Sequence, residues 1–226
     1  MARFLFGSHA AGSWEESSWS SGRSLGFPHR RVARLLGGIK LLCLSLGVMA
    51  LAYCGMVMVE AAAGQARARE VLKHLRAHFL AGSWSHSSWA PAPGSVVGSL
   101  ENPRIGLSVM VLEGTDGNTL KLGAGHLTGS GLPGGGGNMV IAGHRDTFFR
   151  PLRNVRVGDV IDLISPEGTD HYEVVWRRVV APDDIGALQP TRRGVLTLVT
   201  CYPFSYIGAA PERLVVRAKR VEAAAP

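Results

Sequence analysis

Cysteine is scarce in this chain of 226 residues, which has only three. Cys43 and Cys54 lie inside a long apolar stretch near the N-terminus, so Cys201 is the only thiol in the remainder. This distribution excludes a disulfide within the C-terminal part, and a lone cysteine in an exported domain is a free reactive thiol or an intermolecular bridge. Cys43 and Cys54 are interpreted as small apolar residues of a helix.

Recognisable nucleic-acid-binding patterns are also missing. The formal net charge is +7, but the basic residues are scattered and many lie near the apolar stretch. The charge therefore indicates proximity to a membrane surface and solubility rather than binding to DNA or RNA. The glycine-dense segment at 129–137 lacks Gly-Lys-Ser/Thr, so it is interpreted as a flexible connection rather than a phosphate-binding loop.

Charge is absent between Lys40 and Glu60. A helix needs about 20 apolar residues to cross the hydrocarbon core, so we expect one transmembrane anchor at 36–60. Four basic residues precede the apolar run and predict a cytoplasmic N-terminus, with the C-terminal domain outside: Arg30, Arg31, Arg34 and Lys40. A cleaved signal peptide is disfavoured because the leader before the run is too long, and a buried core helix because the run is uniformly apolar.

The flanks of the anchor differ in composition. Residues 1–35 are rich in Ser, Gly and Arg, which predicts a disordered cytoplasmic segment. Residues 61–96 read as a stalk helix followed by a Ser-, Pro- and Gly-rich linker. The helical part carries an apolar stripe: Val71, Leu72, Leu75, Phe79 and Leu80. The alternative is a basic amphipathic helix lying on the outer leaflet. The sequence AGSWxxSSW occurs at 11–19 and again at 81–89, but nine residues do not make a structural repeat.

Residues 97–226 form the folded domain in this interpretation, and their pattern is all-β. Neither heptads nor βαβ alternation is visible, and turn sequences rich in Gly and Pro separate short runs of β-forming residues. Seven short strands are expected, at Ile105–Leu112, Thr119–Gly123, Asn138–Ala142, Val160–Ile164, His171–Val180, Val195–Cys201 and Leu214–Val221. Seven or eight short strands at this spacing favour a closed barrel or a sandwich.

Three reactive side chains fall at expected strand ends. His144 follows one strand, Cys201 ends another, and Arg213 opens the last. If the strands of Cys201 and Arg213 pair antiparallel, the two residues lie at the same end of the ladder. His144 reaches that end if its strand runs parallel to the cysteine strand. Without further pattern, a small buried cysteine, a turn histidine and a surface arginine remain the competing interpretation.

The residue types suit nucleophilic catalysis. A thiol is mostly protonated at neutral pH and needs help to attack a carbonyl. A nearby histidine can take up and return the proton, and a guanidinium can donate hydrogen bonds to the oxyanion that forms. The expected intermediate is a thioacyl-enzyme.

The same residues resemble a known family. The segment TLVTC at 197–201 is similar to the TLxTC signature of sortases, the membrane-anchored cysteine transpeptidases. The segment AGHRDT at 142–147 resembles their histidine segment, and APERLVV at 210–216 resembles their arginine strand. The order His, Cys, Arg also agrees, and the resemblance is closest to class D over most of 100–221.

This resemblance implies an eight-stranded β-barrel in which Cys201 is the nucleophile, His144 the general acid/base and Arg213 the oxyanion stabiliser. It also implies substrate binding by Thr200. The implied reaction cleaves an LPxTG-like sorting signal after Thr and passes the acyl group to an amine of a peptidoglycan precursor or a pilin lysine. The implied location is the cell membrane, with the barrel outside.

Several alternatives stay open. A catalytically silent membrane-anchored β-domain predicts a buried, slowly reacting Cys201, and hydrolysis without transfer uses the same thioester. A papain-like peptidase is disfavoured because no histidine follows Cys201. No cofactor is expected, and calcium is undecided because the acidic residues show no EF-hand spacing. His126 is interpreted as structural or supporting, since no closely spaced ligand pair supports a zinc site with His144 and Cys201.

Overall fold

A computed structural model describes residues 29–82 and 90–222 of this chain. The chain divides into two compact units, residues 1–51 and residues 52–226. The first described element is one uninterrupted helix, α1 (His29–Leu80), which is long and apolar enough to cross a membrane. Most of the segment expected to be disordered, residues 1–28, lies outside the described residues, but residues 29–35 are helical and correct that prediction.

In the C-terminal half of α1, where a stalk was expected, part of the apolar stripe packs on the barrel. Ala68 and Leu72 are buried against the barrel, while Val71 and Leu80 of the expected stripe are exposed. The helix is continuous because the sequence offers no proline between residues 29 and 80, and its alanine-rich segment at 61–68 favours helix. The repeated AGSWxxSSW segments lie outside the described residues, apart from Ala81 and Gly82.

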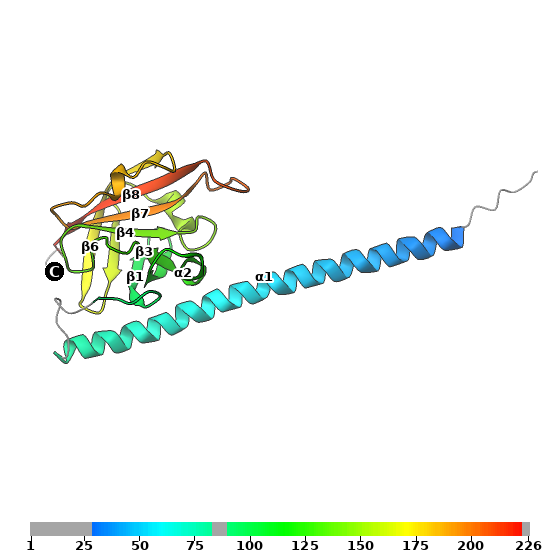
Figure 1. Ribbon diagram of the computed structural model, residues 1–226, viewed down its shortest axis with the longest axis horizontal. Helices are drawn as coiled ribbons and strands as arrows, with labels where there is room; N and C mark the ends of the chain where they lie inside the picture. The colour runs from blue at the N-terminus through cyan, green and yellow to red at the C-terminus, as the bar shows by residue number, and fades with distance from the viewer. Residues whose placement is uncertain (1–28, 83–89, 223–226) are drawn as a thin grey trace, which may run out of the picture. The chain divides into compact units, whose positions relative to one another are not determined.

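The eight strands of the second unit close into a barrel, in the spatial order β1-β2-β3-β4-β7-β8-β6-β5 (Figure 1). The strands are β1 (Val96–Asn102), β2 (Leu107–Glu113), β3 (Ala124–His126), β4 (Asn138–Gly143), β5 (Val160–Ile164), β6 (Thr169–Val180), β7 (Val195–Tyr202) and β8 (Glu212–Val221). Short helices connect them: α2 (Gly117–Leu122) and the 3-10 turns η2 (Arg150–Asn154) and η3 (Gly186–Leu188). The prediction of a closed eight-stranded β-barrel is confirmed.

One expected strand is wrong. Residues 119–123 were predicted to be extended from their alternating pattern, but most of them form α2. Asp116 caps this helix, because its carboxylate accepts hydrogen bonds from the backbone N–H groups of Asn118 and Thr119 and from the Thr119 hydroxyl. A capped turn of this kind outweighs a weak strand propensity over five residues.

Two strands were missed. β1 begins inside the segment expected to be linker, and β3 has only three residues. Gly98 explains part of this, since a side chain there would have its Cβ 2.6 Å from the carbonyl oxygen of Ile164 on β5. The glycine that weakens the strand pattern is therefore what lets β1 and β5 approach closely enough to close the barrel.

The barrel is filled by aliphatic and aromatic side chains from every strand, with Phe149 and Leu152 contributed by the connection after β4. Phe149 is completely buried, and its ring lies directly beneath Gly143. A Cβ at Gly143 would come within 2.8 Å of that ring, so the end of β4 needs glycine. The packing of this connection thereby fixes where the residue after β4 emerges.

Candidate active site

Three neighbouring strands bring the predicted residues together at one end of the barrel. β4 pairs parallel with β7 through Gly143 and Thr200, so His144 emerges one residue beyond the last pair, beside Cys201. β7 pairs antiparallel with β8, and there Cys201 lies directly opposite Arg213. Adjacent strands are about 4.8 Å apart, which places the imidazole, thiol and guanidinium within side-chain reach. The strand pairing expected from the sequence is the one observed.

The accessibility of the three residues suits chemistry with an external substrate. His144 is exposed, while Cys201 and Arg213 are partly exposed. One guanidinium nitrogen of Arg213, Nη1, donates to the carbonyls of Ala210 and Glu212 at 3.1 and 2.9 Å. Because a guanidinium has five N–H donors, this anchoring leaves others available to a substrate oxygen.

Thr200 has a different position from the one expected of a substrate-binding side chain. It is buried, with 2% of its surface exposed, and its hydroxyl donates to the carbonyl of Gly143 at 2.7 Å. The hydrogen bond ties Thr200, which precedes Cys201, to Gly143, which precedes His144. Its side chain therefore holds β4 and β7 in register at the site, and contact of this residue with substrate stays a prediction.

Arg145 is a residue of the site to which sequence reasoning assigned no role. Its side chain is only 6% exposed, and its guanidinium donates to the carbonyls of Pro203, Tyr206 and Gly208 at 3.0, 2.6 and 3.0 Å. These carbonyls all belong to the loop between β7 and β8. Arg145 thus fastens the segment that follows Cys201 and precedes Arg213 to the residue that follows His144.

Comparison with known proteins identifies the fold and the chemistry. The profile described as the sortase domain matches residues 100–221. Sortase D of Bacillus subtilis is 39% identical over 136 residues, which cover 60% of this chain and 69% of that protein. The chain belongs to the sortase family. Sortases are cysteine transpeptidases, and the similarity to sortase D makes this one class D-like.

Solved sortases have the same barrel. A Clostridium perfringens sortase D5 transpeptidase superposes with a TM-score of 0.60 at 24% identity, over 71% of this chain and 99% of that one. Sortase C1 from Streptococcus agalactiae gives a TM-score of 0.52 at 34% identity, over 56% of this chain and 68% of that one. The N-terminal apolar helix agrees with the membrane anchoring expected of a sortase.

A second polar cluster supports the connection between β6 and β7. The Asn138 amide nitrogen donates to the carbonyls of Ala187 and Gln189, both at 3.0 Å, and its oxygen accepts from the Thr197 hydroxyl at 2.6 Å. Asn138 is buried at the start of β4, whose other end leads into His144. The sequence pattern identified Asn138 only as the first residue of a strand. Its hydrogen-bond partners lie about 50 positions or more further along the chain, so the pattern gave no sign of them.

His126 is structural, as one of the interpretations of the sequence held. Its ring is 1% exposed, with Nδ1 2.6 Å from a Glu113 carboxylate oxygen and Nε2 2.9 Å from both the Gly131 carbonyl and the Ser130 hydroxyl. Both ring nitrogens are therefore occupied within the barrel wall. Within residues 29–82 and 90–222, no group of three or more His, Cys, Asp or Glu side chains is placed to hold a metal ion.

Proposed function

We propose that Cys201 is the nucleophile of this sortase, His144 its general acid/base and Arg213 its oxyanion stabiliser. One observation carries the assignment: in a chain of this family, β4, β7 and β8 present these residues side by side at one barrel end. The proposed substrates are proteins with a C-terminal LPxTG-like sorting signal, cleaved after Thr. The proposed acceptor is an amine of a peptidoglycan precursor or of a pilin lysine.

The proposed reaction has two halves. In the first, the Cys201 sulfur attacks the threonine carbonyl carbon while its proton passes to His144, and Arg213 stabilises the negative charge on the oxygen. The peptide C–N bond then breaks, the leaving amine takes the proton from His144, and a thioester remains on Cys201. In the second half an amine attacks the thioester and His144 accepts the amine's proton. The C–S bond then breaks, and the Cys201 thiolate takes that proton back from His144.

The proposed location follows from α1. A single pass through the cell membrane with the N-terminus in the cytoplasm places the barrel outside, where secreted substrates and wall precursors are found. Support comes from the basic residues that precede the apolar run and from the continuity of α1 into the stalk.

The test is a transfer assay with the full chain in detergent or nanodiscs, using a series of LPxTG-like peptides and an amine acceptor. We expect a ligated product whose mass equals the peptide through threonine plus the amine less one water. The Cys201→Ala variant should give none, and Cys54→Ala, which removes a thiol of α1, should react as the unchanged chain does. Cleaved peptide without ligated product at any amine concentration would indicate a hydrolase, and no reaction with any peptide would favour a silent β-domain.

A further inference from the structure

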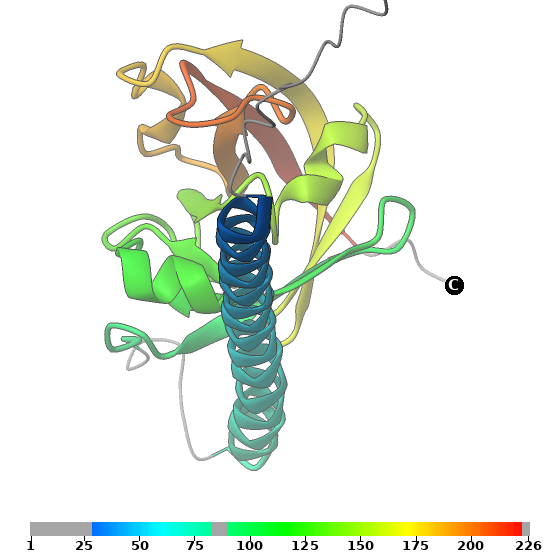
Figure 2. The same cartoon turned by 90° about the vertical axis from the view of Figure 1, so that its right-hand side faces the viewer.

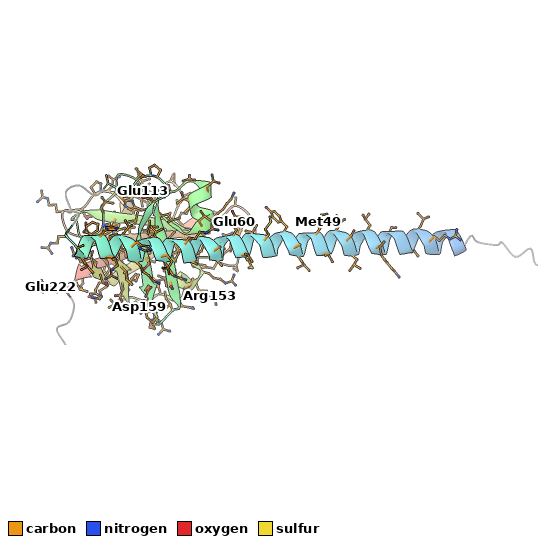
Figure 3. All side chains as sticks on the ribbon, turned by 90° about the horizontal axis from the view of Figure 1, so that it is seen from below. Met49, Glu60, Glu113, Arg153, Asp159 and Glu222 are labelled. Carbon is orange, nitrogen blue, oxygen red and sulfur yellow. The ribbon has the colours of Figure 1, made fainter. Side chains whose placement is uncertain are left out.

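The barrel lies against the last turns of the apolar run of α1. Tyr53, Met56 and Val57, which belong to that run, line a hollow together with Lys121 and Leu122 of α2. Glu60, the first charged residue after the run, also lines this hollow. Figure 3 labels Glu60 on α1. If residues 53–59 are in the membrane, α2 is at the level of the lipid headgroups, where a lysine is well placed.

Specific contacts fix the helix on the barrel in this position. The side-chain amide of Gln65, which is 8% exposed, donates to the Leu122 carbonyl and accepts from the Met110 N–H at 2.8 Å. Gly64 lies against Leu122 so closely that a Cβ would be 3.1 Å from its side chain. A buried polar bridge and close packing therefore fix the segment of α1 around Gly64 and Gln65 on the barrel.

The catalytic end of the barrel faces the same side as the Ala52 end of the helix. Further along α1, Leu72 and Leu75 pack near Val96 and Ile164, at the barrel end where β8 finishes. Cys201 and Arg213 lie at the opposite end, where β8 begins. Figure 1 shows β4 and β7 pointing toward that end, and Figure 2, viewed from that side, shows the loop between β7 and β8 in front.

This loop, residues 203–211, presents an apolar tip. It contains no Asp, Glu, Lys or Arg. Ile207 is 96% exposed, more than any other large hydrophobic side chain in the described ranges, and Tyr206 beside it is 47% exposed. The buried Arg145 holds the backbone on both sides of this tip, at Tyr206 and Gly208. A tyrosine and an isoleucine exposed side by side at the tip of an uncharged, anchored loop are suited to entering the interface of a membrane.

We propose that Tyr206 and Ile207 insert into the outer leaflet of the membrane that α1 crosses, so that the active site opens toward the lipid surface. The proposal rests on the proposed anchoring and topology. The membrane is the occupant because the apolar residues Tyr53, Met56 and Val57 lie beside α2 within the same unit as the barrel. In addition, the loop is uncharged, and a tyrosine next to an aliphatic residue suits the interface. In this arrangement Cys201 works next to the bilayer.

The test uses the full chain in phospholipid nanodiscs with a single environment-sensitive NBD label. Three samples differ in the one cysteine that remains: Ile207→Cys, Arg193→Cys, and the native Cys54 in the apolar run, with the other cysteines changed to alanine. Arg193 is the matched control because it is exposed and precedes β7, at the barrel end away from Cys201. Each label is exposed in turn to lipid carrying a doxyl quencher and to aqueous iodide.

We expect the label at 207 to shift to the blue and to be quenched several-fold more by the doxyl lipid than the label at 193, with iodide showing the reverse order. A label at 207 that iodide quenches as strongly as the one at 193, while Cys54 reports lipid, overturns this proposal and leaves the anchor intact. A Cys54 label that reports water overturns both this proposal and the proposed membrane anchoring by α1. A label at 207 shielded from both quenchers indicates a protein partner and also contradicts the proposal. None of the readouts requires catalysis, so they do not depend on the assignment of Cys201.

Discussion

Two histidines at the ends of neighbouring strands of this barrel have opposite surroundings. His126, at the end of β3, is 1% exposed and has both ring nitrogens within hydrogen-bond distance of Glu113, Ser130 and Gly131. His144, one residue past β4, is exposed, and among the described residues no hydrogen bond engages its ring. A proton carrier must exchange with an external substrate, whereas a ring with both nitrogens bonded and buried holds structure. The surroundings therefore give His126 a structural position and support the role proposed for His144.

The largest effect is expected when the exposed histidine is removed, which tests the contrast between His144 and His126 directly. His144→Ala should lower kcat/KM for transpeptidation by about 10²- to 10⁴-fold, the range for loss of a general acid/base. The melting temperature should stay unchanged, because no described hydrogen bond of the fold uses this ring. Steady-state kinetics and thermal unfolding of the same preparation measure both. Retention of full activity would remove His144 from the mechanism.

The second change removes the buried histidine. His126→Ala should lower the free energy of unfolding by about 3 kcal/mol, because it removes the partner of the Oε2 oxygen of the buried Glu113 carboxylate. Denaturant unfolding of the full chain in detergent measures it.

A matched control for this change is His171→Ala. His171 contacts Asp162 at 2.7 Å, but its side chain is 31% exposed, so the loss there should be under about 1 kcal/mol. Equal losses in the free energy of unfolding for the two variants would show that burial does not determine how much each histidine–carboxylate pair contributes to stability.

A smaller effect is expected at Arg145, which links the His144 segment to the loop after Cys201. Arg145→Met removes three hydrogen bonds from a charged donor and should reduce kcat by about 10-fold or more, with Arg145→Lys recovering part of the loss. As a positioning residue it should affect kcat more than KM and should slow alkylation of Cys201 only slightly. Arg192→Met, at an exposed arginine of a distant turn, is the control, and an equal kcat for the two methionine variants would contradict this role.

The smallest effect on activity and stability is expected at Thr200, whose hydroxyl holds β4 and β7 in register at the site. Thr200→Val keeps the shape of the side chain but removes the hydroxyl that donates to Gly143, at a cost of about 1 kcal/mol in stability and a several-fold loss of kcat. Thr200→Ser should retain the hydrogen bond and most of the activity. If valine and serine behave alike in unfolding and in kinetics, the hydroxyl has no part in holding β4 against β7.

Much of the fold was predictable because the strands that carry the site have strong local patterns. β5 has the expected bounds, and β4 and β7 each end within one residue of the expected position. β1, β3 and α2 were not predicted correctly. A glycine needed for close approach weakens β1, β3 is too short to show alternation, and the Asp116 cap decides the conformation of α2.

The candidate site was likewise predictable only in part. Placing reactive residues at strand ends correctly implied that His144, Cys201 and Arg213 lie at the same end of the barrel, because the pairing of β4, β7 and β8 brings those strand ends together. The role of Arg145 was out of reach, because its acceptors lie about 60 residues away in a loop without regular structure. The family resemblance implied that Thr200 binds substrate, but its side chain is buried. That burial comes from the neighbouring strand β4, and the sequence around Thr200 gives no sign of it.

The central claim is that Cys201, assisted by His144, forms a thioacyl-enzyme at the end of β7. The most direct measurement is intact mass, followed by peptide mapping, of the full chain mixed with a sorting-signal peptide in the absence of amine. The account predicts an adduct on the peptide containing Cys201, equal in mass to the substrate through threonine less one water, discharged by added amine and formed far more slowly by His144→Ala. An adduct only on Cys43 or Cys54, or one that forms on Cys201 at an unchanged rate in His144→Ala, would contradict it.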